Sequence, residues 1–450
     1  MTARLLRFDW VALGLASFLL YLLTLCPTVY WYDSAEYAAA GALLGIPHPP
    51  GYPLYTLLAH VFTWLPGEPA LNVNTMSAVF GAVACSLTCL VARRLGAGTA
   101  GGLLSGALLA TTPLVWSNAT VAEVYTAGLA FLLGTVLLLL HDRAVLAALL
   151  AGLGLGVHYS LATCGLGLLV LALRDDRSPR RIFACAGAAL AGASILLALP
   201  LRAFSGPPSL MIGDPRTWSG FWWIVSGGTY KEWFTGGRDV LARVLQGGPG
   251  WIALLLAVAG LARLARRDLP AALALALAVA GNVAFFHAYR VHDVEVFLIP
   301  SIAIACVLTG VAFEGARENV RVAPALALAV LLWPAGRAAV LWRAMDRSGD
   351  RSAREFIARL DRELPRGALI FQFSNPSEWR FHAVFALYGQ KVLGTRPDVV
   401  VPEWTLSPDQ LTRAVASGRP VFAYVSHPEL ASLFRIREEA GIVRLLPRAE

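Results

Sequence analysis

Residues 124–140 read Val-Tyr-Thr-Ala-Gly-Leu-Ala-Phe-Leu-Leu-Gly-Thr-Val-Leu-Leu-Leu-Leu and contain no Asp, Glu, Lys or Arg. A helix needs an uncharged apolar run of about this length to cross the hydrocarbon core of a bilayer. The whole chain is apolar, since 57% of its 450 residues are hydrophobic, 15% are charged, and the mean hydropathy is +0.61. Soluble domains carry about 25% charged residues. The composition therefore excludes an ordinary soluble protein and predicts a membrane protein.

Apolar stretches on both sides of this run predict about eleven transmembrane helices. They lie at 10–28, 71–92, 99–115, 124–140, 144–157, 160–173, 183–201, 249–265, 270–287, 296–313 and 322–341. The first stretch follows Arg4 and Arg7, but no small-residue cleavage site comes after it. We therefore interpret it as an uncleaved first span and not as a signal peptide.

Arginine is concentrated in alternate loops between the predicted spans. These loops are 93–98, 141–143, 174–182, 263–269 and 314–321. The first loop on the other side, 29–70, contains Asp33, Glu36 and Glu68 but no Lys or Arg. By the positive-inside rule, the N-terminus and the Arg loops face the cytoplasm. The net charge of +8 is thereby explained, and no basic and aromatic surface indicates nucleic acid as a partner.

The C-terminal part of the chain has a more charged composition. We divide the chain into a transmembrane domain, 1–343, and an extracytoplasmic domain, 344–450. In the second, strands are predicted at 368–373, 398–401 and 421–425, and helices at 379–388 and 407–416. Strands that alternate with helices predict a small parallel sheet. The predicted fold class is an α-helical polytopic membrane protein with a small C-terminal α/β soluble domain.

The unusual polar and aromatic residues lie in loops that this topology places on the outer side. The candidates for a functional site are Asp33, Glu36, His48, Tyr52, Glu123, Tyr125, His158, Arg202, Tyr230, Lys231 and Asp293. Ionisable groups at membrane depth are costly to keep there, so they indicate function by default. We expect these side chains to converge on one outer face.

Structural interpretations of the same residues stay open. Asp33 and Glu36 have the spacing of a helix N-cap with its capping-box partner, although such a cap would also orient Asp33 to act as a general base. The Tyr and Trp residues around them fit an interfacial belt or a surface on which sugars stack. Glu123 and His158 either satisfy one another or nearby backbone groups, or they line the site. Arg202, at a helix end, is either an anchor that snorkels to the lipid interface or a phosphate clamp.

Several short motifs occur together in the first two thirds of the chain. They read Asp33-Ser-Ala-Glu-Tyr37, Leu44-Gly-Ile-Pro-His-Pro-Pro-Gly-Tyr-Pro-Leu-Tyr55, Asn72-Val-Asn74, Ala122-Glu-Val-Tyr125, Gly152-Leu-Gly-Leu-Gly-Val-His-Tyr159, Leu199-Pro-Leu-Arg202 and Gly213-Asp-Pro-Arg-Thr-Trp218. In this order the chain resembles, from residue 1 to about 300, bacterial relatives of the eukaryotic transmembrane protein O-mannosyltransferase family, within the GT-C superfamily. The His-Pro-Pro-Gly-Tyr-Pro string is the most specific motif, although a turn stiffened by prolines is also plausible as pure architecture.

This resemblance implies a GT-C fold and a glycosyltransferase that uses a polyprenyl-phosphate sugar, with mannose as one candidate. It places the catalytic carboxylate in the first outer loop, which corresponds to Asp33 with Glu36 nearby. Asp33 would accept the proton of the acceptor hydroxyl during inversion at the anomeric carbon, and Arg202 or Lys231 would stabilise the leaving phosphate. The acceptor is a protein, a lipid or a glycan, and membrane lipids surround the helices.

No ligand spacing demands a cofactor, but Asp33, Glu36 and Glu123 offer oxygen ligands for a divalent cation. Two other functions stay open. A transporter or flippase of a lipid-linked sugar would line a pathway with polar groups, yet these gather on the outer face and not at the midplane, where transporter sites usually lie. A non-catalytic envelope assembly protein would use residues 344–450 to bind its partners.

Overall fold

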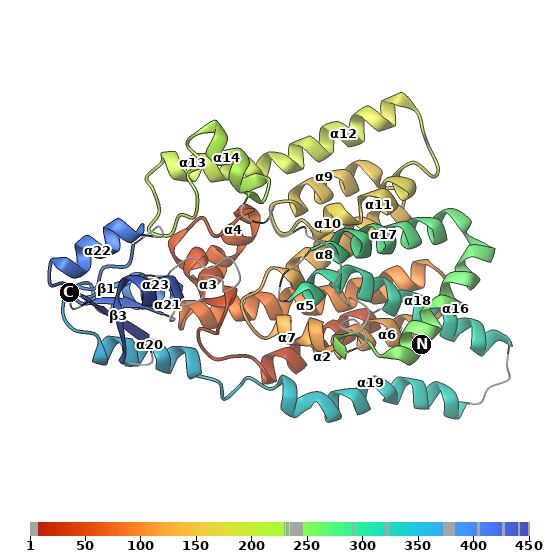
Figure 1. Cartoon of the computed structure of the whole chain (residues 1–450). Helices are drawn as coiled ribbons and strands as arrows, with labels where there is room; N and C mark the ends of the chain where they lie inside the picture. Colours follow the sequence, from red (N-terminus) through yellow and green to blue (C-terminus); the bar gives the residue numbers. More distant parts are fainter. Residues whose placement is uncertain are drawn as a thin grey trace.

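The computed structural model shows an elongated, mostly helical molecule with a small sheet at one end (Figure 1). It describes residues 8–228, 230, 234, 246–289, 291, 293–319, 324–371, 383–402, 406–424, 428–439 and 442–448. The apolar helices are α2 (Asp9–Leu23), α5 (Pro69–Arg94), α6 (Gly98–Ala110), α7 (Pro113–Ala119), α8 (Tyr125–Leu140), α9 (Ala144–Gly154), α10 (Ser160–Thr163), α11 (Gly165–Ala172), α12 (Pro179–Ala193), η1 (Ser194–Leu197), α13 (Ala198–Phe204), α16 (Trp251–Arg267), α17 (Leu269–His287), η3 (Val294–Leu298), α18 (Ile299–Asn319) and α19 (Pro324–Met345). Each predicted apolar stretch coincides with one or more of them.

Within the described ranges, four helical stretches are long and apolar enough to cross a membrane. They are Pro69–Arg94, Pro179–Phe204, Leu269–His287 and Val294–Ala316. A fifth would be α6 with α7, which are separated by a 65° bend. The bend precedes Pro113, and the residue before a proline is kept out of the helical region. The chain is therefore a multi-pass membrane protein, and eleven spans stay a prediction.

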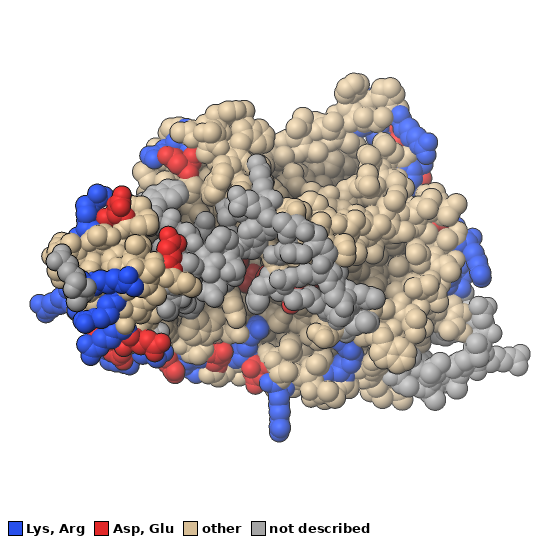
Figure 2. Space-filling model, in the orientation of Figure 1, with Lys and Arg blue, Asp and Glu red and all other residues tan. Residues whose placement is uncertain are grey.

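The arginine loops lie together at one end of the molecule. The contacts that join them are Arg93 Nη1 to Asp9 Oδ1 (2.8 Å), Arg94 Nε to the Leu140 carbonyl (3.0 Å), Arg181 to Asp142 (2.7 Å) and Arg174 to Asp268 (3.1 Å). Figure 2 shows Lys and Arg mainly at the two ends, with a largely uncharged body between them. This distribution matches a slab of membrane around the body, because charges are costly in hydrocarbon.

Some helices approach closely through small residues. A Cβ atom added to Gly152 of α9 would lie 2.2 Å from the carbonyl oxygen of Ala189 in α12. One added to Gly192 of α12 would lie 2.3 Å from the carbonyl oxygen of Leu149. Transmembrane helices associate largely through such van der Waals packing, which small residues permit. The α9–α12 pair therefore depends on glycine at both positions.

The loops at the opposite end contain three more helices: α3 (Asp33–Leu43), α4 (Pro53–Phe62) and α14 (Trp218–Val225). The backbone of Ile46 exchanges hydrogen bonds of 2.8 Å with Leu210 and Ile212, and the Leu54 amide donates to the Gly156 carbonyl at 2.9 Å. Segments far apart in the sequence are thus tied together. The expected convergence of these loops on one face is found in the described residues.

The C-terminal segment, residues 346–448, carries all the strands that the structure describes. Its elements are α20 (Ser352–Glu363), β1 (Leu369–Phe371), α21 (Ala383–Lys391), α22 (Pro408–Ala416), β2 (Val421–Ala423), α23 (Pro428–Leu433), β3 (Arg435–Glu439) and β4 (Ile442–Leu446). The strand order is β1-β2-β4-β3, in which β1 and β2 are parallel and β4 is antiparallel to both of its neighbours. The predicted all-parallel sheet is therefore wrong, because the β3–β4 hairpin makes it a mixed sheet.

The other C-terminal predictions have varied outcomes. The helix predicted at 407–416 is present as α22, and Ser407 and Gln410 form its capping box. The strand predicted at 398–401 forms an isolated parallel bridge between Val400 and Leu369. Residues 372–373 and 379–382 of the predicted elements lie outside the described residues. The division into two domains stays a prediction.

Candidate active site

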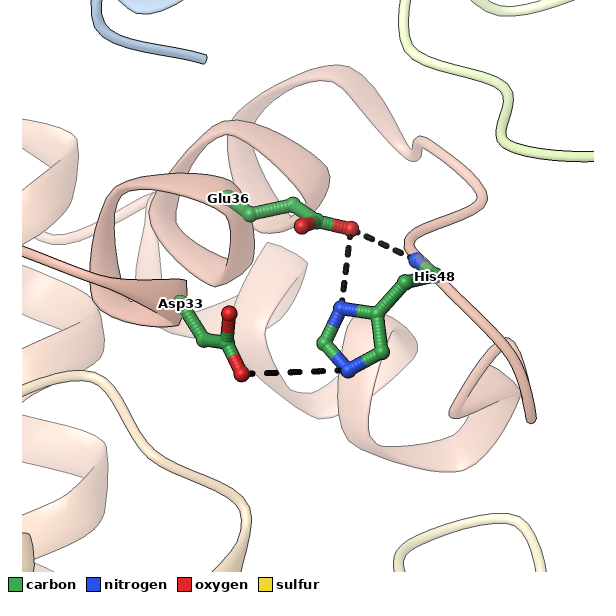
Figure 3. A group of neighbouring side chains, drawn as sticks. All are labelled: Asp33, Glu36 and His48. Atoms are coloured by element: carbon green, nitrogen blue, oxygen red, sulfur yellow. Dashed lines mark hydrogen bonds and ion pairs between the residues drawn. The ribbon is translucent and has the colours of Figure 1, made fainter. Parts of the chain in front are cut away.

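The helix α3 carries Asp33 and Glu36 in its first turn. Residues three and four apart share a helix face, so Tyr37 lies on the same side as Asp33. The residue that caps α3 is Tyr32, with φ 61°, and no side chain caps the helix. The capping-box interpretation is therefore wrong: Asp33 is the first helical residue, and Glu36 turns toward His48 instead (Figure 3).

Glu36 fixes His48 through two contacts. Its Oε1 accepts a hydrogen bond of 2.5 Å from the His48 backbone amide and lies 3.2 Å from Nδ1 of the ring. Because a carboxylate only accepts, the ring donates through Nδ1. The other ring nitrogen, Nε2, lies 3.2 Å from the Tyr52 hydroxyl, 3.4 Å from the Tyr37 hydroxyl and 3.8 Å from Asp33 Oδ2. Glu36 thus holds the imidazole with Nε2 turned toward Asp33.

The carboxylates of Asp33 and Glu36 differ in their exposure to solvent. The side chain of Asp33 is 29% exposed, whereas that of Glu36 is 4% exposed. A general base must come within hydrogen-bonding distance of the proton that it takes. The more exposed Asp33 side chain can be reached by an acceptor group, whereas the buried Glu36 is suited to anchoring His48.

The turn that carries His48 has an unusual backbone. Gly51 has φ 85°, and a Cβ atom there would lie 3.0 Å from Ile224 of α14 and from Leu199 of α13. The next residue, Tyr52, has φ 42° and caps α4. Non-glycine residues at positive φ are uncommon and persist where surrounding contacts impose the conformation. Here the conformation brings the Tyr52 hydroxyl to His48.

Aromatic rings continue across the site from Tyr52 to His158. The two rings are parallel with centroids 6.2 Å apart, and Tyr125 meets His158 edge-on at 5.0 Å. The Nδ1 atom of His158 accepts a hydrogen bond of 3.1 Å from the Ser160 amide. Burial, and then the neighbouring His48, lower the pKa of His158 to about 3. The imidazole of His158 is therefore neutral at pH 7 and lines the site.

Glu123 lies in the turn before α8. Its backbone amide donates to Ser77 Oγ at 3.2 Å, and Ser77 Oγ donates back to the Glu123 carbonyl at 3.3 Å. Burial, and then the negative charges of Asp33 and Asp293, raise the pKa of Glu123 well above its ordinary value. Three carboxylates therefore influence one another here. The hydrogen bonds of the described residues include none between Glu123 and His158.

Arg202 has a role that the sequence did not indicate. Its Nε donates to the Leu44 carbonyl at 3.0 Å and its Nη2 to the Leu43 carbonyl at 3.5 Å, while Nη1 donates to the Gly206 carbonyl. The last carbonyls of a helix lack partners within it. Arg202 thus caps the C-terminal end of α3, and this geometry favours neither the phosphate clamp nor the lipid anchor.

The segment that follows α14 in the sequence contributes Tyr230. Its ring centroid lies 6.2 Å from that of His48 and 6.2 Å from that of Tyr289. Burial raises the pKa of Tyr230 well above its ordinary value. Asp293 directly precedes η3, and Lys231 lies outside the described residues.

The site region also contains Arg347, which sequence reasoning missed. Its Nη1 donates to the Ser117 carbonyl at 2.5 Å and to Thr120 Oγ1 at 3.0 Å, and its guanidinium lies 4.6 Å from the centre of the Tyr30 ring. Its positive charge acts to lower the pKa of Glu123. The change in composition near this position was visible, but its partners lie up to 230 residues earlier in the chain.

Asp33, Glu36 and His48 have potential ligand atoms within 4.8 Å of one another. In the described part of the chain, this group replaces the predicted set that included Glu123. Carboxylate oxygen and imidazole nitrogen suit cations such as zinc, and a carboxylate on the other ring nitrogen commonly orients such a ligand. Asp33 and His48 Nε2 would hold the ion, with Glu36 behind the ring. A bound cation would supply positive charge that neutralises negative charge at the site.

The part of the chain that contains most of these residues is similar to known proteins. Residues 33–179, which include Asp33, Glu36, His48, Glu123 and His158, match the family model described as the N-terminal domain of protein O-mannosyl-transferase TMEM260. Over 108 residues the chain is 41% identical to protein O-mannosyl-transferase TMEM260 of Mus musculus, covering 24% of this chain and 15% of that protein. Over 120 residues it is 29% identical to the Dictyostelium discoideum protein of that name, covering 26% and 15%. The chain thus spans about 15% of the length of these curated relatives.

The solved structures with a similar fold extend over almost all of the chain. ArnT of Cupriavidus metallidurans, crystallised with undecaprenyl phosphate, has a TM-score of 0.62 at 16% identity and covers 99% of this chain and 100% of its own. The oligosaccharyltransferase AglB of Archaeoglobus fulgidus, in complex with an inhibitory peptide and a dolichol-phosphate, has a TM-score of 0.51 at 11% identity and covers 90% and 65%. Residues 33–179 are therefore similar to the N-terminal domain of the TMEM260 protein O-mannosyl-transferases, and the chain as a whole has a fold similar to those of ArnT and AglB.

Proposed function

We propose that this chain is an integral membrane hexosyltransferase that moves a sugar, with mannose as the first candidate, from a polyprenyl-phosphate carrier to a hydroxyl of an extracytoplasmic acceptor. The observation that carries the proposal is the accessible carboxylate of Asp33 beside a fixed His48, at the end of a bundle of apolar helices. The names of the TMEM260 relatives support mannose and a protein acceptor. The lipid phosphates bound to ArnT and AglB support the carrier.

The proposed reaction is a single displacement at the anomeric carbon. The acceptor oxygen forms a bond to that carbon while its proton passes to Asp33. On the opposite face, the bond from the anomeric carbon to the phosphate oxygen breaks, and the polyprenyl phosphate leaves with the electron pair. Configuration is therefore inverted, and no covalent sugar–enzyme intermediate forms.

The surrounding side chains have distinct proposed roles. Glu36 orients His48, which lies beside Asp33 and limits its movement. Tyr52, Tyr125 and Tyr230 offer ring faces and hydroxyl groups for the sugar. Lys231 stays the candidate for the leaving phosphate, since Arg202 is engaged with the end of α3.

We infer that this reaction centre faces the extracytoplasmic side of a bacterial cytoplasmic membrane. The distribution of arginine supports this orientation, because the arginine loops share the other end of the molecule. The polar candidates gather at one end, whereas transporters usually bind substrate near the midplane. This placement favours the enzyme over the transporter.

The test of the proposal is the Asp33→Asn variant, which keeps the size of the side chain but removes the base. We expect sugar transfer from undecaprenyl-phosphate mannose to a serine- and threonine-containing peptide to fall by about 10²- to 10⁴-fold. Donor binding should stay close to wild type, since the phosphate and lipid are recognised elsewhere. The matched control is Asp346→Asn, a change of the same kind at an exposed position. Transfer by Asp33→Asn at the wild-type rate would exclude the assigned base.

A further inference from the structure

The C-terminal segment covers the second face of α3. Ala35, Ala38 and Ala39 are buried, and they belong to one hydrophobic cluster with Phe356 of α20 and Phe385 of α21. The first face of the helix carries the candidate base and turns toward His48 (Figure 3). The helix is thus enclosed between the reaction centre and the C-terminal segment, which lies beside α3 in Figure 1.

The C-terminal segment also contacts the residues that lead into α3. The ring of Trp31 lies 5.5 Å from that of Phe356 and 5.0 Å from that of Phe385, between centroids. Its Nε1 donates to Ser352 Oγ at 2.6 Å. Aromatic pairs at such distances contribute beyond their buried area. Trp31 therefore fixes the chain two residues before Asp33.

Tyr388 of α21 joins the two ends of the first loop. Its hydroxyl donates to Glu68 Oε1 at 3.2 Å and accepts from the Ala70 amide at 3.2 Å. The same carboxylate oxygen accepts a hydrogen bond of 2.7 Å from Thr28 Oγ1. Thr28 precedes α3 and Ala70 lies in the first turn of α5, so one buried hydroxyl group ties together the entry and the exit of the loop.

Arg347 makes the second connection. Its backbone amide donates to the Thr24 carbonyl at 3.1 Å, and its side chain reaches the Ser117 carbonyl and Thr120. Thr120 lies three residues before Glu123. Arg347 therefore links the end of α2 to the turn that carries Glu123.

From these contacts we propose that the C-terminal segment positions the reaction centre, with Tyr388 and Arg347 setting the placement of the Asp33 helix relative to the Glu123 turn. Both act through Glu68 and Thr120, so they are positioning residues. The kinetic part of this inference rests on the proposed function, whereas its structural part does not. A segment in this role is an integral part of the active site and not a detachable partner-binding domain.

The experiment compares single variants of the full-length protein in lipid nanodiscs. Tyr388→Phe removes one hydroxyl and keeps the ring, and Arg347→Gln removes the charge. The matched controls are Tyr21→Phe, which removes a buried hydroxyl that donates to the Ala110 carbonyl, and Arg351→Gln, at an exposed position in the same connection as Arg347. Hydrogen–deuterium exchange of residues 29–45 reports the placement of α3. Turnover of undecaprenyl-phosphate mannose with a serine- and threonine-containing peptide gives kcat and KM.

We expect faster exchange in residues 29–45 and a fall in kcat of about 10- to 100-fold in both variants, because a small misplacement of a catalytic group has effects of this size. KM for the donor should change by less than about threefold, since uniform substrate binding is retained. Arg347→Lys should recover part of kcat. In Arg347→Gln the pKa of Glu123 should rise further, because a positive charge that lowers it has been removed.

The outcomes separate the two proposals. The positioning role would be overturned if Tyr388→Phe and Arg347→Gln had the same hydrogen–deuterium exchange in residues 29–45 and the same kcat as the control variants. If wild type shows no turnover of the donor while both variants loosen residues 29–45, the proposed function fails and the positioning role stands. If wild type turns over and the variants exchange as wild type does, the positioning role fails alone.

Discussion

His158 illustrates how burial determines the chemistry of a single residue. Its ring is 4% exposed, and burial lowers its pKa to about 3. In an unfolded chain a histidine has a pKa of about 6.5. Below that value the unfolded chain takes up the proton and the folded protein does not. The stability contribution of His158 is therefore complete above about pH 6.5 and is lost as the pH falls toward 3.

We predict that acidification from pH 7.5 to pH 5 costs the folded protein about 2 kcal/mol through His158. His158→Gln, which keeps an acceptor for the Ser160 amide, should lose this part of the acid sensitivity. The measurement is the midpoint of thermal unfolding at both pH values in the same nanodiscs. His141→Gln, at an exposed site, is the control and should behave as wild type. Equal acid sensitivity in His158→Gln and wild type would contradict the prediction.

The sequence was sufficient to single out the acidic and aromatic members of the site. Asp33, Glu36 and His48 stand out because charged residues are rare in such an apolar chain. The roles of Arg202 and Arg347 could not be predicted, since most of their recorded acceptors are backbone carbonyls. Backbone groups leave no pattern in a sequence, and these acceptors become neighbours only when the chain has folded.

At the scale of the elements, close helix packing gives a sharp test. Gly192 and Gly187 both lie in α12, but only Gly192 faces α9. A Cβ atom at Gly192 would lie 2.3 Å from the Leu149 carbonyl oxygen, whereas one at Gly187 meets nothing within 4 Å.

We predict that Gly192→Ala destabilises the protein by about 1–3 kcal/mol, because an inserted methyl group forces the helices apart. Gly187→Ala should have almost no effect. Thermal unfolding in detergent compares the two variants with wild type. If both variants shift the midpoint equally, the α9–α12 contact is not the cause.

The helices were easier to predict than the strands. An uncharged run of apolar residues has few alternatives to a helix in a membrane, so each predicted stretch coincides with one or more helices. Among the described residues, four helical stretches are long and apolar enough to cross a membrane. The β3–β4 hairpin was missed because β3 reads Arg435-Ile-Arg-Glu-Glu439 and is mostly exposed. A charged edge strand protects a sheet from pairing with other chains, but it lacks the alternating apolar pattern by which strands are predicted.

For the molecule as a whole, the orientation in the membrane can be measured. We predict that Trp64→Cys and Ser348→Cys, at exposed positions in parts of the chain that the proposed topology places outside, react with a membrane-impermeant maleimide in intact cells. Arg177→Cys, in an arginine loop, should react only after the membrane is permeabilised. The native cysteines give a low background, since five of the six are buried. Labelling of Arg177→Cys alone in intact cells would reverse the proposed orientation.

The contact between Trp31 and Ser352 joins residues that are 321 positions apart in the chain. A ribosome that adds about 5–20 residues per second leaves a gap of roughly 15–65 s between their synthesis. During that interval the first loop has emerged, but the surface that will cover its alanine face has not been made. Under the proposed positioning role, the first loop reaches its final arrangement only after residues 352–385 have been made. A chain released before that point would contain every residue proposed to contact the sugar. It would lack the C-terminal segment that is proposed to hold the reaction centre in position.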